Sequence, residues 1–327
     1  MQLPTLKIGS LLPKFPVVQG GMAIRISTAP LAAAVAEAGG VGTIAGTGMS
    51  LEELAAEIRQ AKKLTRGIIG VNVLFAARNF AQLVTTAMRE KVDFIVSGAG
   101  FSRDMFAWGR ETGTPIVPIV SSARLAKLAE KMGAAALVVE GVEAGGHLGT
   151  DMPLKSILAD IREAVKIPII AAGGIATGAE AAKFLSLGAD GVQLATRFLA
   201  SHECTAPMNY KEAHVGVKQE DIVLVDSPVG LPGKAIRNSF SERMARQLSP
   251  EGEKCSTCLK KCSRRFCIFA ALNRAQQGDL ENGLIFSGES AVKIKKILPV
   301  EAIMEELVEG IKNSPAREDP QKDTIQE

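Results

Sequence analysis

Two short stretches decide the fold: Ala171-Ala172-Gly173-Gly174-Ile175 and, one helix later, Gly191-Val192-Gln193-Leu194-Ala195-Thr196-Arg197. Each is an apolar run that ends in small residues and is followed by a sequence able to begin a helix. The last two strands of a parallel barrel end in this way where backbone N–H groups and a helix N-terminus meet a phosphate. The pair therefore predicts a barrel that binds a phosphorylated cofactor.

The same unit recurs towards the N-terminus. Eight apolar runs follow each other at intervals of roughly 21 to 31 residues, the length of one strand and one helix. They are centred near Val18, Thr43, Val71, Ile95, Val117, Val138, Ile169 and Val192. The runs are continuously apolar rather than alternating, which is typical of parallel strands buried on both faces.

Helical stretches rich in alanine separate these runs. They span residues 30–38, 51–64, 79–90, 102–112, 122–132, 155–165 and 177–187. Eight such units predict an α/β protein with a (β/α)8 TIM barrel. The alternative is a doubly wound open sheet, but the first strand is not followed by the Gly-x-Gly-x-x-Gly sequence of a dinucleotide-binding domain.

Composition argues against several classes of partner. The 327 residues are 46% hydrophobic and 22% charged, enough for one large core and an extension. A net charge of +3, one Trp and one Tyr give no support to a nucleic-acid partner, and no apolar run reaches membrane-spanning length. The N-terminus lacks a basic stretch followed by an apolar one, so we expect a cytoplasmic protein without a membrane partner.

The domain boundaries follow from these patterns. We expect the barrel over residues 1–200 and a mostly helical cap over 201–312, with helices at 268–276 and 299–311. Residues 313–327 are polar and interrupted by proline, and we expect a disordered tail. A homodimer is left open.

In such a barrel, the chemistry lies where strands end and loops begin. His147 is the one histidine expected on such a loop, and an imidazole with a pKa near neutrality is suited to moving a proton. The structural alternative is a loop histidine bonded to a backbone carbonyl. His202 and His214 lie beyond the barrel, and we expect them to be solvated or to cap helices.

Five motifs in register carry a resemblance to a known family. They are Gln19-Gly20-Gly21-Met22, Gly70-Val71-Asn72, Glu143-Ala144-Gly145-Gly146-His147, Ala171-Ala172-Gly173-Gly174-Ile175 and Gln193-Leu194-Ala195-Thr196-Arg197-Phe198. Together they resemble the flavin-dependent nitronate monooxygenases, formerly 2-nitropropane dioxygenases. That family includes the flavin-dependent enoyl-acyl-carrier-protein reductase II enzymes, and the motifs do not separate the two branches.

The resemblance implies FMN, with its ring over the mouth of the barrel and its phosphate between the last two loops. His147 falls on the family's catalytic histidine. Carried over by position, the cofactor-binding residues would be Gly21, Met22, Asn72, Glu140, Gly145, Gly174, Gln193, Leu194, Ala195 and Thr196. Two of them depart from the family pattern, which often has Gln in place of Glu140 and Gly in place of Ala195.

A cysteine-rich segment follows the barrel. Its spacing, C-x2-C-x3-C-x4-C, is compact enough to surround one metal ion or iron–sulfur cluster, with Cys255, Cys258, Cys262 and Cys267 as ligands. The alternative, which we favour, is a set of reduced thiols in the cap. Five basic residues alternate with the cysteines. They form either a solvated face or a binding surface for an acidic acyl carrier protein or a cofactor phosphate. They are Lys254, Lys260, Lys261, Arg264 and Arg265.

The preferred function is an FMN-dependent nitronate monooxygenase that oxidises alkyl nitronates with O2. His147 would orient the anion and would act as a base towards a neutral nitroalkane. The alternative is an enoyl-acyl-carrier-protein reductase that uses NAD(P)H as reductant, in which His147 supplies a proton or polarises the thioester carbonyl. A phosphate-binding lyase or isomerase without flavin ranks last, because no lysine stands at a predicted strand end.

Overall fold

The barrel predicted from the sequence is present in the computed structural model, which describes residues 1–248 and 255–315. Eight parallel strands close in the order β1-β2-β3-β4-β5-β6-β8-β9. Each contains one of the eight predicted run centres. The strands are β1 (Val17–Gln19), β2 (Val41–Ala45), β3 (Ile68–Leu74), β4 (Phe94–Gly98), β5 (Ile116–Val120), β6 (Leu137–Glu140), β8 (Ile169–Ala172) and β9 (Gly191–Leu194).

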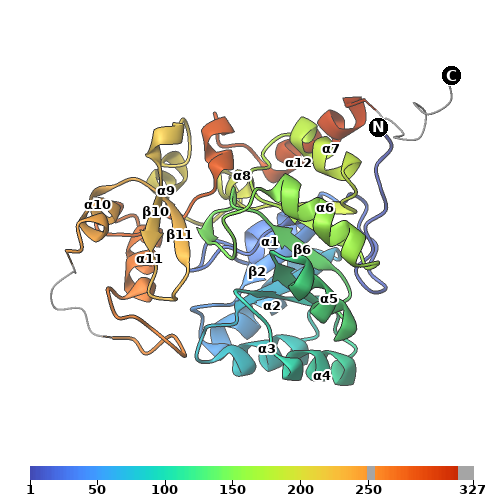
Figure 1. Ribbon diagram of the computed structural model, residues 1–327, viewed down its shortest axis with the longest axis horizontal. Coiled ribbons are helices and arrows are strands. Elements are labelled where there is room, and N and C mark those ends of the chain that lie inside the picture. Colours follow the sequence, from blue (N-terminus) through green and yellow to red (C-terminus); the bar gives the residue numbers. More distant parts are fainter. Residues whose placement is uncertain (249–254, 316–327) are drawn as a thin grey trace.

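Seven helices between these strands lie within one residue of the predicted ranges at each end. They are α1 (Ala29–Glu37), α2 (Leu51–Leu64), α3 (Phe80–Arg89), α4 (Arg103–Thr112), α5 (Ala123–Lys131), α6 (Leu154–Ala164) and α7 (Gly178–Ser186). The agreement has a local cause in the caps. Ser50 and Thr177 each begin a helix with a capping box, in which the hydroxyl accepts a backbone N–H three residues on. Helices such as α2, α3, α5 and α6 lie around the barrel (Figure 1).

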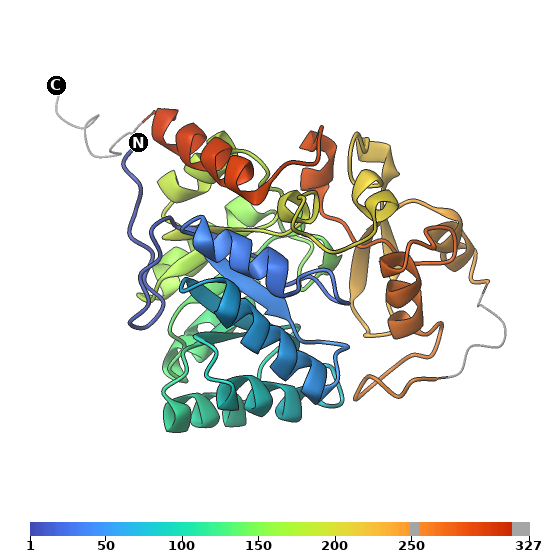
Figure 2. The same ribbon diagram turned by 180° about the vertical axis from the view of Figure 1, so that it is seen from behind.

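The ring of helices is completed by α12 (Val300–Asn313), which packs against α7 and α1. Figure 2 shows this C-terminal helix beside the N-terminal α1. The backbones of α7 and α12 approach closely where two glycines face each other. A Cβ added at Gly178 would lie 2.5 Å from the carbonyl oxygen of Leu307 and 2.6 Å from Cα of Gly310. Helix α12 falls within the range expected for the cap, but its contacts are those of a barrel helix.

Residues between β9 and α12 form an extension on one side of the barrel (Figures 1 and 2). Its helices are α8 (Thr196–Leu199), α9 (Met208–Glu212), α10 (Ser239–Ala245) and α11 (Ile268–Gln276), and the last of these has the predicted bounds. A hairpin of β10 (Ile222–Asp226) and β11 (Pro232–Ile236) joins β7 (Gly146–His147) in an antiparallel sheet that the sequence did not predict.

The predicted division into barrel, cap and tail stays a prediction, and from residue 316 onward the predicted tail lies outside the described residues. No helix in the described part of the chain combines the length and the apolar character that crossing a bilayer requires.

The strands of the barrel alternate between two apolar cores. Val18, Val96, Val138 and Ile170 belong to the core inside the barrel, whereas Val71, Val139 and Val192 belong to the core between strands and helices. Because side chains alternate along a strand, Asn72, Glu140 and Gln193 point to the interior at the carboxyl ends of β3, β6 and β9. Three polar side chains therefore close the top of an otherwise apolar barrel.

We expect Gly310→Val to destabilise the fold by about 1–3 kcal/mol, because the added side chain would be forced against Cα of Gly178, only 2.9 Å from the position of a Cβ. Urea unfolding followed by circular dichroism measures the effect. The control is Glu309→Ala, one residue away on the exposed face of α12. Equal midpoints for the two variants would show that the helices can separate without cost.

Candidate functional site

A cavity of about 530 Å³ lies at the carboxyl ends of the barrel strands. This size is within the range of small-molecule sites. The cavity is lined by His147 and by every predicted cofactor residue: Gly21, Met22, Asn72, Glu140, Gly145, Gly174, Gln193, Leu194, Ala195 and Thr196. The structure thus brings together residues from the ends of five barrel strands that lie far apart in the sequence, and their contacts with a flavin stay a prediction.

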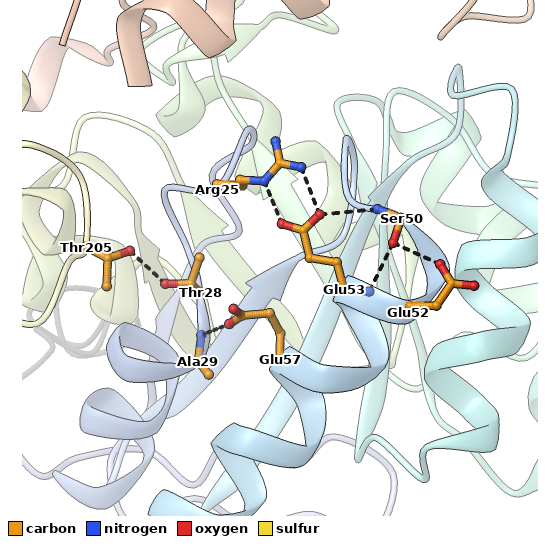
Figure 3. Close-up of polar contacts among 8 residues, drawn as sticks. All are labelled: Arg25, Thr28, Ala29, Ser50, Glu52, Glu53, Glu57 and Thr205. Carbon is orange, nitrogen blue, oxygen red and sulfur yellow. Dashed lines mark hydrogen bonds and ion pairs between the residues drawn. The ribbon is translucent and has the colours of Figure 1, made fainter. Parts of the chain in front are cut away.

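The first wall is the loop between β1 and α1. Ser27 fixes its shape, because its hydroxyl accepts the backbone N–H of Met22 at 2.9 Å and a hydrogen bond from Gln19 Nε2 at 2.9 Å. Arg25 ties the loop to the start of α2 through two bonds to the Glu53 carboxylate, at 2.5 and 2.8 Å (Figure 3). The guanidinium of Arg25 lowers the pKa of Glu53. The loop is therefore held from both sides before any ligand binds.

Glycines let the backbone approach the cavity at several further positions. Gly173 and Gly174 follow β8 with φ of +113° and +72°, values that side chains rarely adopt. A Cβ at Gly145 would lie 2.5 Å from the backbone nitrogen of Gly288, and a Cβ at Gly21 would lie 2.5 Å from Cβ of Asn72. Gly145, Gly173 and Gly174 form a cradle of backbone beside the cavity, which fits a phosphate group.

His147 lies on β7, where the extension fixes its backbone. It pairs with Gly233 of β11, and the next residue, Leu148, donates its N–H to the carbonyl of Pro232 at 2.9 Å. The imidazole Nε2 is 2.7 Å from the hydroxyl of Ser227, and the ring meets the edge of Phe286 at a centroid distance of 5.1 Å. The side chain thus reaches the cavity in a fixed orientation.

The expectation that His147 titrates near neutrality is wrong. Burial lowers the pKa of the imidazole to about 4, because the surrounding protein solvates the imidazolium poorly. The ring is therefore neutral at pH 7 and offers no positive charge to an anionic substrate. The expectation for His202 is confirmed, since it is exposed. His214 is not solvated but fits the capping alternative: it is buried, and its Nδ1 lies 2.9 Å from the carbonyl oxygen of Tyr210 near the C-terminus of α9, with Nε2 3.3 Å from the carbonyl oxygen of Phe286.

Glu140 also faces the cavity and does not turn outwards. Burial raises the pKa of its carboxyl to about 8. The next acid along the chain, Glu143, differs because both its carboxylate oxygens accept the N–H of Leu154, at 3.0 and 3.3 Å. The cavity thus holds one carboxyl group that the fold anchors and one that it leaves towards the ligand.

The outer half of the cavity is apolar. Ile268, Phe269 and Leu272 of α11 and Leu259 of the cysteine-rich segment line it opposite Ile24 and Met49 of the barrel. The segment is held against the loop after β3, since Arg78 donates its backbone N–H to the carbonyl of Cys258 at 2.8 Å. The extension therefore supplies an apolar entrance to a polar interior.

The cysteines do not form a metal site in this structure. Among the described residues, which include all four predicted ligands, no three His, Cys, Asp or Glu side chains are arranged to hold a metal ion. Cys255 and Cys262 are exposed, and Cys258 and Cys267 are half-buried. The hydroxyl of Ser256 lies 3.4 Å from Sγ of Cys267.

The basic patch is smaller than the sequence predicts. Lys260 donates to the carbonyl of Phe75 at 2.6 Å and lies over its ring, and Arg265 is paired with Asp226 at 2.7 Å. Lys261 and Arg264 are exposed, and Lys254 lies outside the described residues.

Sequence reasoning missed the residues that support His147. Ser227 and Phe286 are 80 and 139 positions away from it, and no motif or spacing links them to the loop after β6. Lys234 is a third such residue: its buried ammonium group bonds the carbonyl of Val142 and the carboxylate of Glu289. The only sequence signal for these residues was weak: Ser227-Pro228 is a pair typical of a turn, and it lies in the turn between β10 and β11.

Comparison with known proteins gives a consistent result. A sequence model described as "Nitronate monooxygenase" matches residues 5–82 and 74–310. The chain is 34% identical over 232 residues to a 5-hydroxy-7a-methyl-1-oxo-octahydro-1H-indene-4-carboxyl-CoA dehydrogenase of Mycobacterium tuberculosis. That match covers 70% of this chain and 65% of the relative, so the chain spans less than two thirds of the relative's length.

Two solved structures extend the likeness over nearly the whole chain. FabK from Thermotoga maritima is 33% identical, with a TM-score of 0.81, and the match covers 92% of this chain and 93% of that one. A nitroalkane oxidase from Streptomyces ansochromogenes is 26% identical, with a TM-score of 0.79 and coverage of 92% and 96%.

Proposed function

Because the chain belongs to the nitronate monooxygenase family of flavin-dependent oxidoreductases, we propose that it is an FMN enzyme that reduces the double bond of an acyl thioester with NAD(P)H. When bound, FMN would supply the hydride chemistry between the nicotinamide and the substrate. The glycine cradle at Gly145, Gly173 and Gly174 would hold the phosphate of the cofactor, with Thr196 beside it.

The observation that carries this proposal is the two-part cavity. Its inner half is polar and its outer half is lined by Leu259, Ile268, Phe269 and Leu272, all supplied by the extension. An apolar acyl chain gains affinity by leaving water for such a surface, roughly 0.8 kcal/mol for each buried methylene. Two relatives point in the same direction: the first is named as a dehydrogenase of an indene-carboxyl-CoA thioester, and the second is FabK, an enoyl-acyl-carrier-protein reductase II.

The charge of the site supports a neutral substrate over an anionic one. His147 is neutral at pH 7, and Arg78, a cation at the rim, directs its Nε to the carbonyl of Thr257 at 2.9 Å. A nitronate anion would therefore meet no cationic anchor at His147. A thioester needs instead a hydrogen-bond donor for its carbonyl oxygen, which a neutral imidazole can provide.

Oxidation of alkyl nitronates with O2 is the second candidate. The matching family model and the Streptomyces nitroalkane oxidase favour it. An acyl carrier protein remains a proposed partner for the first candidate, with the exposed Lys261 and Arg264 as its contact points. A free acyl-CoA thioester is the other carrier of the same chemistry.

Anaerobic stopped-flow spectroscopy separates the two functions. We expect the purified protein to show flavin absorption that NADH or NADPH bleaches and that a medium-chain enoyl-CoA then restores. Phe269→Arg should impair the second step, because it places a charge in the apolar half, and should leave the bleaching unchanged. The control is Leu128→Arg on the exposed face of α5. Bleaching by propyl-2-nitronate, without any response to the thioester, would favour nitronate oxidation instead.

A further inference from the structure

We propose that Ser227 is a positioning residue that sets the tautomer of His147: its hydroxyl donates to Nε2, so that the ring hydrogen lies on Nδ1. A neutral imidazole carries one such hydrogen, and only the nitrogen that holds it can donate. The tautomer therefore decides what the ring offers to a ligand in the cavity. The expected effect on catalysis rests on the proposed function.

The imidazole of His147 has one hydrogen-bond partner in the described chain. Its Nε2 lies 2.7 Å from Oγ of Ser227, within hydrogen-bonding range. Nδ1 bonds none of the described residues, and His147 lines the cavity. The ring is neutral at pH 7, because burial lowers its pKa to about 4. The protein thus engages one ring nitrogen and leaves the other for a ligand.

The direction of this bond follows from the surroundings of the Ser227 hydroxyl. Ser227 is buried and is not among the residues that line the cavity, so its hydrogen finds no acceptor there. Its oxygen accepts the backbone N–H of Val229 at 3.4 Å. Over residues 1–248 and 255–315, Nε2 of His147 is the one acceptor within reach of the hydroxyl hydrogen. The hydroxyl therefore donates and Nε2 accepts, which leaves the ring hydrogen on Nδ1.

The opposite tautomer would leave a buried hydroxyl without an acceptor. With the hydrogen on Nε2, the ring would donate to Oγ of Ser227, and the hydroxyl hydrogen would have no partner of its own. An unsatisfied buried group disfavours such a form roughly 5- to 150-fold. Ser227 thus keeps most of the protein in the Nδ1–H form.

The position of Ser227 is set by the turn between β10 and β11. Its carbonyl accepts the N–H of Gly230 at 3.0 Å, which closes the turn. The cysteine-rich segment holds the same turn, because Ser263 donates its N–H to the carbonyl of Pro228 at 3.0 Å. The hydroxyl is therefore placed by segments that contain none of the predicted cofactor residues.

Phe286 restricts the rotation of the imidazole. Its ring lies nearly perpendicular to that of His147, at an angle of 76° and a centroid distance of 5.1 Å. Room for Phe286 comes from Gly233, the register partner of His147 on β11, where a Cβ would lie 2.8 Å from Cε1 of Phe286. Since one contact holds Nε2 and the other packs against the ring, Nδ1 keeps a single direction.

A ring that donates through Nδ1 suits the carbonyl oxygen of a thioester. This oxygen gains negative charge as the β-carbon of the substrate is reduced, and a donor aimed at it stabilises that state. The opposite tautomer would turn a lone pair of Nδ1 towards the oxygen and repel it. Ser227 therefore acts on the reaction without touching the substrate, through the nitrogen on which it places the hydrogen of His147.

The tautomer can be measured directly, because the chain contains only three histidines. Nitrogen-15 NMR of the histidine-labelled protein at pH 7 separates protonated from unprotonated ring nitrogens, and His147→Gln identifies the signals of His147. We expect a protonated Nδ1 and an unprotonated Nε2 in the wild type. Ser227→Ala should lose this single form, and Ser227→Thr should keep it because threonine retains the hydroxyl.

The kinetic measurement is reduction of a medium-chain enoyl-CoA by the flavin-loaded protein. Ser227→Ala should lower this rate roughly fivefold or more, with reduction of the flavin by NADH within about threefold of the wild type, and Ser227→Thr should restore it. The control is Ser201→Ala. Ser201 also has a buried hydroxyl, which accepts the N–H of Cys204 at 3.2 Å, but it does not line the cavity or contact His147.

The outcomes separate the role of Ser227 from the proposed function. A protonated Nε2 in the wild type, two protonated nitrogens, or an unchanged spectrum in Ser227→Ala would overturn the role of Ser227. An equal loss of rate in Ser201→Ala would do the same, since it would show a general effect on the fold. A wild type that has the Nδ1–H form but does not reduce the thioester would confirm the tautomer and overturn the proposed function.

Discussion

Replacing Gly174 with valine should lower the affinity for FMN roughly 100-fold, the effect of losing about two hydrogen bonds to a charged phosphate at about 1.5 kcal/mol each. Gly174 has a φ of +72°, and a Cβ there would lie 3.0 Å from Cβ of Glu143. Valine would both strain this backbone and fill the space through which it approaches the ligand. Titration of the apoprotein with FMN, followed by flavin fluorescence, measures the loss.

The matched control is Gly188→Val. Gly188 follows the other end of α7 with a φ of +100°, and a Cβ there would meet the side chain of Arg162 and not the cavity. Both variants carry the same kind of backbone strain, so a similar loss of stability is expected in each. If both variants bind FMN equally well, the phosphate does not lie at the loop after β8.

Replacing His147 with alanine should lower turnover of the thioester roughly 10²–10³-fold, as removal of a single hydrogen-bond donor to a developing oxyanion does. Flavin binding should change little, because the imidazole of His147 bonds Ser227 and no residue of the phosphate cradle. Its Nε2 is engaged by Ser227, which leaves Nδ1 for the substrate. Steady-state kinetics with His147→Ala and His147→Gln measure the effect, and glutamine should restore part of the rate.

The pH profile distinguishes this role from proton transfer. With a pKa of about 4, His147 should produce no inflection in kcat/KM near neutrality. Its folded-state pKa lies below the ordinary 6.5, so its contribution to stability is present above pH 6.5 and is lost as the pH falls towards 4. His202→Ala, an exposed histidine, is the control. An inflection near pH 6.5 that disappears with His147→Ala would restore the acid–base assignment.

The barrel could be predicted from the sequence because its determinants are local. Each strand is a continuous apolar run, and four of the helices between the strands begin at a capping hydroxyl, from Ser50, Ser102, Ser122 and Thr177. The loops that line the cavity were also predictable, since the carboxyl ends of parallel strands always meet at one end of a barrel. Gly21, Asn72, Glu140 and Gly174 were found in this way.

The electrostatics of the site depended on contacts that no local pattern encodes. Whether His147 is charged depends on its burial, and the residues against its ring come from distant segments: Ser227 from the hairpin of β10 and β11, and Phe286 from the chain after α11. Likewise, α12 begins at Val300, far along the chain from β9, which ends at Leu194, and it closes the ring beside α7, where Gly178 and Gly310 let the two backbones come close.

The sequence by itself determined the barrel, its catalytic end and the identity of the residues there. Only the tertiary structure decided their protonation, because a pKa depends on the water and charge that the whole fold leaves around a group. Glu140 shows this most clearly: the strand pattern alone directs it into the barrel, but burial by the rest of the fold raises the pKa of its carboxyl to about 8.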